Sequence, residues 1–217
     1  MRDVKRRRYH SPLRDAQAAA SRAAVLQAAR ELFVAQGYGR TTLDQIAERA
    51  GVSKPTVFSA VGNKAQVLKA VRDVAMAGDD EPESVTARPD VAAIAAAGDL
   101  DLAIELAVRH IAEVVIRYHP IHEVLHGAAG SDPAAAALWE VAERERRVGA
   151  SHLVERLGRP AATTARRAAD VLSLLMAPDV YDRLVVRAGW SRVAYERWLG
   201  EQIRALYAPG PRPSALS

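Results

Sequence analysis

The sequence of 217 residues contains no cysteine and no long apolar run, and each absence excludes a class of protein. Without cysteine the chain forms no disulfide bridges and no thiolate metal sites, which is typical of cytoplasmic proteins. A membrane-spanning helix needs about 18 to 20 apolar residues, and arginine, glutamate or histidine interrupts every candidate run. The basic start of the chain lacks the apolar stretch of a signal peptide. We therefore expect a soluble, cytoplasmic protein.

Lysine is also scarce, and all four lysines lie in the first third of the chain. Residues 1–77 contain 14 Lys and Arg against 6 Asp and Glu, a net charge of +8, whereas residues 78–217 contain 16 against 20, a net charge of −4. Phosphates of nucleic acids attract basic segments of this kind. The split predicts a nucleic-acid-binding part at the N-terminus, and a solvated basic surface is the alternative.

The apolar pattern predicts an all-α protein of two domains, because no segment alternates between apolar and polar residues as a strand does. Residues 1–20 show no apolar periodicity and contain Pro12, which favours a flexible basic arm. The predicted parts are this arm (1–20), a helix-turn-helix DNA-binding domain (21–77), a linker (78–99), an effector-binding and dimerisation domain (100–208) and a disordered tail (209–217).

Capping signals define the helices of the N-terminal domain. The first helix follows Ser21 and ends near Gly37, because glycine readily adopts the left-handed conformation of a C-cap. The starts of the following helices are marked by residues whose side chains can accept hydrogen bonds from the free backbone N–H groups of the first turn. These are Thr42 with Gln45, Ser53 before Pro55, and Asn63 with Gln66. The second and third helices are joined by Gly51-Val52-Ser53, a spacing that lets the third helix lie in the DNA major groove.

The C-terminal part is predicted to be a bundle of longer helices. The segment from Leu100 to Tyr118 carries apolar residues on several sides, which is typical of a buried core helix. Proline breaks helices in their interior, so Pro120, Pro133, Pro160 and Pro178 are expected to separate the next ones. The remaining helices are predicted near 121–129, 133–157, 162–176, 180–188 and 191–207.

The stretch from Arg22 to Arg72 resembles the DNA-binding domain of the TetR family of bacterial repressors. The matching residues are Ala28-Ala29-Arg30-Glu31-Leu32-Phe33, Gly37-Tyr38, Thr41-Thr42, Ile46-Ala47, Ala50-Gly51-Val52-Ser53, Thr56-Val57-Phe58, Asn63-Lys64 and Val67-Leu68. The resemblance implies a regulator, most often a repressor, that binds a palindromic operator in double-stranded DNA as a homodimer and responds to a small molecule. It implies neither an enzyme nor a cofactor.

Several residues of the third helix are candidates for contacting bases. Lysine donates to guanine acceptors, proline contacts a thymine methyl group, and serine pairs either way. Lys54, Pro55 and Ser59 lie on the predicted outward face of the third helix, so we expect them to contact bases in these ways. Thr42 and Ser53 lie at helix N-termini, where exposed N–H groups and the helix dipole favour phosphate.

Other residues are expected to hold the DNA backbone. Thr56 and Lys64 match family positions that contact phosphates, although Lys64 as a solvated surface lysine is the alternative. Phe58 stands where the family usually has tyrosine and can pack against sugars without donating a hydrogen bond. Ala60 and Val61 also depart from the family pattern, replacing histidine or tyrosine and phenylalanine. Binding should therefore depend more on basic groups, namely Arg40, Lys54 and the N-terminal arm.

A rival interpretation starts from His122-Glu123-Val124-Leu125-His126. Two histidines one helical turn apart with an intervening glutamate match the zinc-binding pattern of metalloproteases, and Glu143 or Glu145 could supply a third ligand. The alternative function is a zinc-dependent hydrolase. A metal-binding or ligand-contacting role for His119, His122 and His126 without catalysis is a further alternative to simple hydrogen-bonded burial.

The family resemblance implies a ligand pocket and a dimer interface in the C-terminal domain. The polar groups expected to line an apolar pocket are His119, His122, Trp139 and Tyr181. Two apolar stripes are expected to face a partner subunit, with packing inside one chain as the alternative. They contain Leu172, Leu175 and Met176, and Trp198, Leu199 and Leu206.

Overall fold

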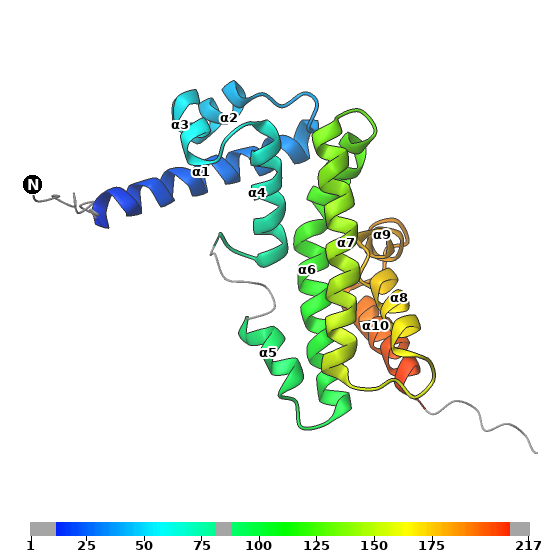
Figure 1. Ribbon diagram of the computed structural model, residues 1–217. Coiled ribbons are helices and arrows are strands. Elements are labelled where there is room, and N and C mark those ends of the chain that lie inside the picture. Colours follow the sequence, from blue (N-terminus) through cyan, green and yellow to red (C-terminus); the bar gives the residue numbers. More distant parts are fainter. Residues whose placement is uncertain (1–11, 81–87, 209–217) are drawn as a thin grey trace, which may run out of the picture. The chain divides into compact units, whose positions relative to one another are not determined.

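The structure is a computed structural model that describes residues 12–80 and 88–208 (Figure 1). Within these ranges the chain is helical and contains no strand, which confirms the predicted all-α class. The chain divides into two compact units, residues 1–71 and residues 72–217. None of the helices in the described ranges combines the length and the apolar character that crossing a membrane requires.

From residue 12 onward the first unit contains three helices and the beginning of a fourth. They are α1 (Pro12–Gln36), α2 (Leu43–Ala50), α3 (Lys54–Ala60) and α4 (Lys64–Ala77), of which residues 64–71 belong to this unit. Each helix contributes apolar side chains at helical spacing to one small core. Its fully buried members include Val25, Phe33, Ile46, Val57 and Val67.

The predicted caps are present at the helix ends of this unit. Thr42 accepts a hydrogen bond from the Gln45 backbone N–H, and the Gln45 side chain accepts one from the Thr42 N–H, so the capping box is complete. Ser53 caps α3 by accepting from the Thr56 N–H, with Pro55 in the first turn. Gly51 ends α2 with a φ of 67°, a left-handed conformation that costs glycine no steric strain.

The boundaries of two predicted flexible segments differ from the structure. The predicted arm extended to residue 20, but α1 already begins at Pro12. Proline is well tolerated in a first helical turn, and the alanines that follow favour a helix. The predicted linker 78–99 likewise contains the helix α5 (Pro89–Ala95). Residues 1–11 and 81–87 lie outside the described residues, as does the predicted tail 209–217.

The second unit is built around two long helices, α6 (Leu100–Ala129) and α7 (Pro133–Leu157), which pack against each other (Figure 1). The other elements of this unit are α5, α8 (Ala165–Leu175), α9 (Pro178–Tyr181), the π-helix η2 (Asp182–Arg187) and α10 (Arg192–Tyr207). A continuous apolar core joins α6 to α7, α8 and α10. Its fully buried side chains include Ile104, Ile111, Leu172, Tyr195 and Leu199.

The predicted break at Pro120 is wrong, because α6 continues through this residue to Ala129. An interior proline costs a helix about 3 kcal/mol. Buried side chains on both sides of it offset that cost, since burying one large apolar side chain contributes about 1.5–3 kcal/mol. Tyr118, Ile121 and Leu125 are each at most 6% exposed.

The last turns of α4 belong to the second unit, not to the first as the predicted boundary at residue 77 implied. Arg72 is 4% exposed and forms ion pairs with Glu145 of α7 and with its neighbour Asp73. Arg117 of α6 donates from Nε to the Ala75 carbonyl (3.1 Å) and from Nη2 to the Met76 carbonyl (3.0 Å). These bonds satisfy carbonyls at the C-terminus of α4 that have no partner within the helix.

Candidate functional site

The third helix of the first unit has one buried and one exposed side. Val57 is fully buried and fixes the rotation of α3 against the core. The predicted base-contacting residues Lys54, Pro55 and Ser59 are all exposed, and the Phe58 ring is 62% exposed. The helix therefore presents to solvent the side chains that the sequence selects for contact with DNA.

A long-range hydrogen bond holds the C-terminal end of α3. Arg22 of α1 donates from Nη1 to the Ala60 carbonyl at 3.0 Å. The last turn of α3 contains no basic residue of its own, and a cation near the final carbonyls is favourable for both hydrogen bonding and the helix dipole. The sequence gives no sign of this contact, because 38 residues separate its partners.

The predicted backbone-contacting residues are held in place by neighbours. Lys64 donates from Nζ to the Tyr38 carbonyl at 3.0 Å and lies 4.1 Å from the centre of the Tyr38 ring, so it is not simply a solvated surface lysine. Arg40 donates from Nε to the Gln36 carbonyl at 2.7 Å. The Ser53 and Thr56 hydroxyl groups lie 2.7 Å apart and are hydrogen bonded.

The predicted ligand-contacting residues lie in two ring pairs of the second unit. The His122 ring centre is 4.9 Å from that of Trp139, and the His119 ring centre is 5.4 Å from that of Tyr181. An edge contact at 5.5 Å extends the second pair to the buried Tyr195. Sequence reasoning thus selected residues that the fold brings together around α6.

The imidazole of His122 is 1% exposed and is neutral at ordinary pH. Burial lowers its pKa to about 4, and the nearby charges of Arg146 and His126 act in the same direction, against the opposing effect of Asp179. The Nε2 atom lies 3.2 Å from the Asp179 carboxylate.

Several buried polar atoms of this region have no well-aligned hydrogen-bond partner among the described residues. They are the hydroxyl oxygens of Tyr118 and Tyr195 and the Nε2 atoms of His119 and His122, whose neighbouring carboxylates are close but not aligned for a hydrogen bond. Unpaired polar atoms in an apolar interior are costly, and a bound polar group can satisfy them. They are candidates for orienting a ligand.

The metalloprotease interpretation is not supported by the surroundings of the two histidines. His122 and His126 both pack against the Trp139 ring. The two candidates for a third ligand are engaged elsewhere, since Glu143 pairs with Arg146 and Glu145 with Arg72. In the part of the chain that the structure describes, no three His, Asp or Glu side chains are grouped so that they could hold a metal ion.

Half of the predicted dimer contacts are corrected by the fold. Leu172, Leu175 and Leu199 are at most 5% exposed within a single chain, so they form its core instead of facing a partner. The reason is that α8 packs one side onto the bundle and turns the other to solvent. That exposed side carries Val171 (38% exposed) and Leu174 (62% exposed). Met176, Trp198 and Leu206 are half-buried against the same core.

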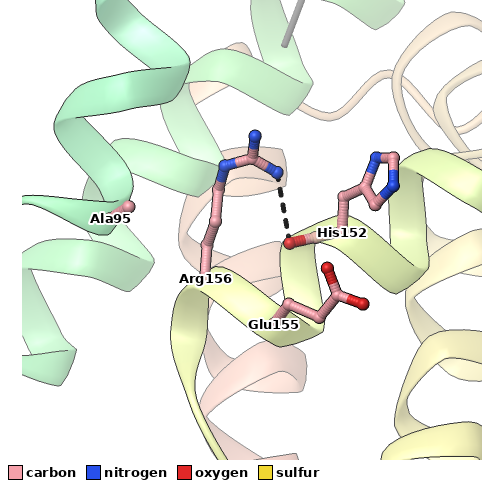
Figure 2. A pocket seen from close by; sticks show the side chains of 4 residues that line it. All are labelled: Ala95, His152, Glu155 and Arg156. Atoms are coloured by element: carbon pink, nitrogen blue, oxygen red, sulfur yellow. Dashed lines mark hydrogen bonds between the residues drawn. The ribbon is translucent and has the colours of Figure 1, made fainter. Parts of the chain in front are cut away.

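An open hollow of about 480 Å³ lies elsewhere in the second unit, lined by residues of α5 and α7 (Figure 2). Its lining residues are Ala95, His152, Glu155 and Arg156, and Arg156 donates to the His152 carbonyl at 3.2 Å. None of these residues was among the predicted site residues, because they belong to no sequence motif.

Comparison with known proteins identifies the first unit. Residues 25–71 match the family described as bacterial regulatory proteins, tetR family. The HTH-type transcriptional regulator SrpR of Pseudomonas putida is 40% identical over 76 residues, which are 35% of this chain and 34% of that protein. The uncharacterized HTH-type transcriptional regulator TtgW, also of P. putida, is likewise 40% identical over 76 residues, 35% of this chain and 54% of the relative. The matched segment thus spans about a third and about half of these two relatives.

Solved structures resemble most of the chain. NalD, the secondary repressor of the MexAB-OprM multidrug efflux pump in Pseudomonas aeruginosa, has a TM-score of 0.64 at 22% identity, covering 88% of this chain and 98% of its own. SmeT in complex with triclosan has a TM-score of 0.63 at 19% identity, covering 91% and 99%. At these identities the likeness establishes the fold. The sequence match to the family of bacterial regulatory proteins of tetR type is confined to residues 25–71, so it identifies the helix-turn-helix part of the chain.

Proposed function

We propose that this protein is a transcriptional repressor that binds a palindromic operator as a homodimer and is released or altered by a small molecule. The observation that carries the proposal is α3, a helix capped at both ends whose exposed side presents Lys54, Pro55 and Ser59. A helix of this kind enters the major groove in helix-turn-helix proteins, and its side chains contact base edges.

The remaining contacts in this proposal position the protein on the DNA backbone. Lys64 is held against Tyr38 and offers a charge to phosphate, and Arg40 adds a second basic group. The caps formed by Thr42 and Ser53 mark the starts of α2 and α3, where backbone N–H groups favour an anion. Thr56 and Phe58 complete the set, the latter by packing against a sugar.

The homodimer follows from the need to contact two half-sites of a palindrome with two copies of α3. The exposed apolar side of α8 supports this proposal, because Leu174 and Val171 are large apolar groups in solvent. Met176, Trp198 and Leu206 flank the same core and remain candidates at the edge of the interface.

The effector is proposed to be a small apolar or amphipathic molecule that binds beside α6. The buried polar atoms of His119, His122 and Tyr118, which lack a well-aligned hydrogen-bond partner among the described residues, would orient it. Trp139 and Tyr181 would form apolar walls. The structural neighbour SmeT is known in complex with triclosan. Binding at α6 would be coupled to DNA through the end of α4, which Arg117 and Arg72 attach to α6 and α7.

Selection from a random duplex library with the full-length protein, read by sequencing, tests the proposal. A palindrome with half-sites about one helical turn apart is the expected product. Lys54→Ala should then relax selectivity at one position of each half-site, at a cost of about 1–3 kcal/mol per contact. No enrichment by the wild-type protein would exclude operator binding.

Deletion of residues 2–11 should weaken binding to every duplex and reduce its dependence on salt. The segment contains Arg2, Lys5, Arg6, Arg7 and Arg8 and ends just before α1 begins. Each basic group that neutralises a phosphate contributes about 0.9 to the slope of log K against log salt concentration. Titrations at several salt concentrations compare the two proteins, and equal slopes would show that the segment does not contact DNA.

A further inference from the structure

An acidic side chain lies among the proposed DNA contacts. The Lys54 Nζ donates to the Asp44 Oδ2 at 2.9 Å, linking the first residue of α3 to the second residue of α2. Both side chains are exposed, Lys54 by 54% and Asp44 by 69%. A carboxylate at this place repels the phosphates of any DNA that approaches α3, so its presence needs a physical explanation.

The position of Lys54 supplies one. The N-terminus of a helix carries partial positive charge, which disfavours a cation there, and the first turn of α3 has no acidic residue of its own. Asp44 lies in the first turn of α2, where a negative charge is favourable, and provides the missing counter-charge. The pair therefore favours a location of the ammonium group beside Asp44 before DNA is bound.

Such a pair affects two kinds of DNA binding unequally. Binding to DNA of arbitrary sequence is almost entirely electrostatic, so a lysine neutralised by a carboxylate contributes little to it. Binding to a guanine edge depends on two acceptors, O6 and N7, at defined positions. Exposed ion pairs are weak, so acceptors that are correctly placed can displace the carboxylate.

We propose that Asp44 is a specificity-determining residue, which restrains Lys54 from binding phosphates of arbitrary DNA and releases it to a guanine of the operator. This inference rests on the proposed DNA-binding function and deepens it. Asp44 itself contacts no base in the proposal; it is a positioning residue that acts through Lys54.

The test compares Asp44→Asn with wild type on the selected operator and on an unrelated duplex at several salt concentrations. Affinity for the unrelated duplex should rise about two- to fivefold with a salt slope larger by about 0.9, while affinity for the operator changes less. The ratio of the two affinities therefore falls. Glu48→Gln is the matched control, because it removes the same charge from an exposed position one turn further along α2 and should change the ratio little.

A second comparison tests whether Asp44 acts by positioning Lys54 or simply by repelling DNA phosphates. In a Lys54→Ala background, Asp44→Asn should leave the affinity ratio unchanged, because the group through which it acts is gone. An equal change in both backgrounds, or an unchanged ratio in the single variant, would overturn the inference. Selection of an operator by the wild-type protein is scored separately, so failure of the proposed function is distinguished from failure of this inference.

Discussion

Leu174→Glu is expected to convert the proposed dimer into a monomer and to lower its affinity for the proposed operator about a hundredfold or more. Leu174 is the most exposed large apolar side chain of α8, at 62%. In a two-fold interface the same residue contributes twice, and covering one leucine contributes about 1.5–3 kcal/mol. Glutamate would remove both contributions and place like charges near the axis.

The loss of operator affinity follows from the loss of the second half-site. Two linked recognition helices bind with an effective concentration that raises affinity about 10²- to 10⁴-fold over one. Sedimentation of the free protein and titration with the selected operator measure the two effects. Leu102→Glu is the matched control, since Leu102 is also an exposed leucine of the second unit (43%) and lies in the first turn of α6, where glutamate is favourable. A Leu174→Glu protein that stays dimeric would remove α8 from the interface.

Acidification from pH 7 to pH 4 is expected to destabilise the protein by about 3 kcal/mol through His122 alone. Burial lowers the pKa of this imidazole from 6.5 to about 4, so the folded protein takes up a proton there only near pH 4. The unfolded chain takes it up near pH 6.5. The free energy of unfolding is therefore unaffected by His122 above about pH 6.5. It declines as the pH falls from 6.5 to 4, because the unfolded chain binds a proton that the folded protein does not.

Charged groups near His122 also affect its pKa. Arg146 of α7 and His126 of α6 lower the pKa further, whereas Asp179 of α9 opposes them. Urea unfolding of wild type and His122→Gln at intervals from pH 7 to pH 4 measures the difference between their pH profiles. The glutamine side chain keeps a polar group but does not titrate, so the profile of the variant should be flatter. His122→Phe is a second non-titrating variant, which controls for any effect of the glutamine amide. Parallel profiles for all three proteins would contradict the prediction.

The local parts of the fold could be predicted from the sequence. Thr42 with Gln45 and Ser53 with Pro55 act within one helical turn, so their residue types determine their structure without reference to distant parts. The helix-turn-helix and its exposed residues followed from such signals and from the family resemblance. His119 and Tyr181 were predicted to line a pocket, but the contact between their rings was not predicted, because it joins two distant segments of the chain.

The predictions that were wrong concerned features determined by contacts between distant segments of the chain. Pro120 was expected to end a helix, and only the burial of its neighbours explains why α6 continues. The stripe containing Leu172 has the same pattern whether it faces a core or a partner, so periodicity could not separate the two. Arg22 and Arg117 hold the ends of other helices through bonds that no spacing indicates.

The turn after α4 restricts how this chain can vary. Gly78 has a φ of +98°, and a Cβ placed there would lie 3.3 Å from the Arg117 guanidinium carbon. A side chain at position 78 would both strain the backbone and press on the group that holds the Ala75 and Met76 carbonyls. Any residue other than glycine at position 78 would therefore strain the turn and displace the Arg117 guanidinium by a few tenths of an ångström, which would loosen the end of α4.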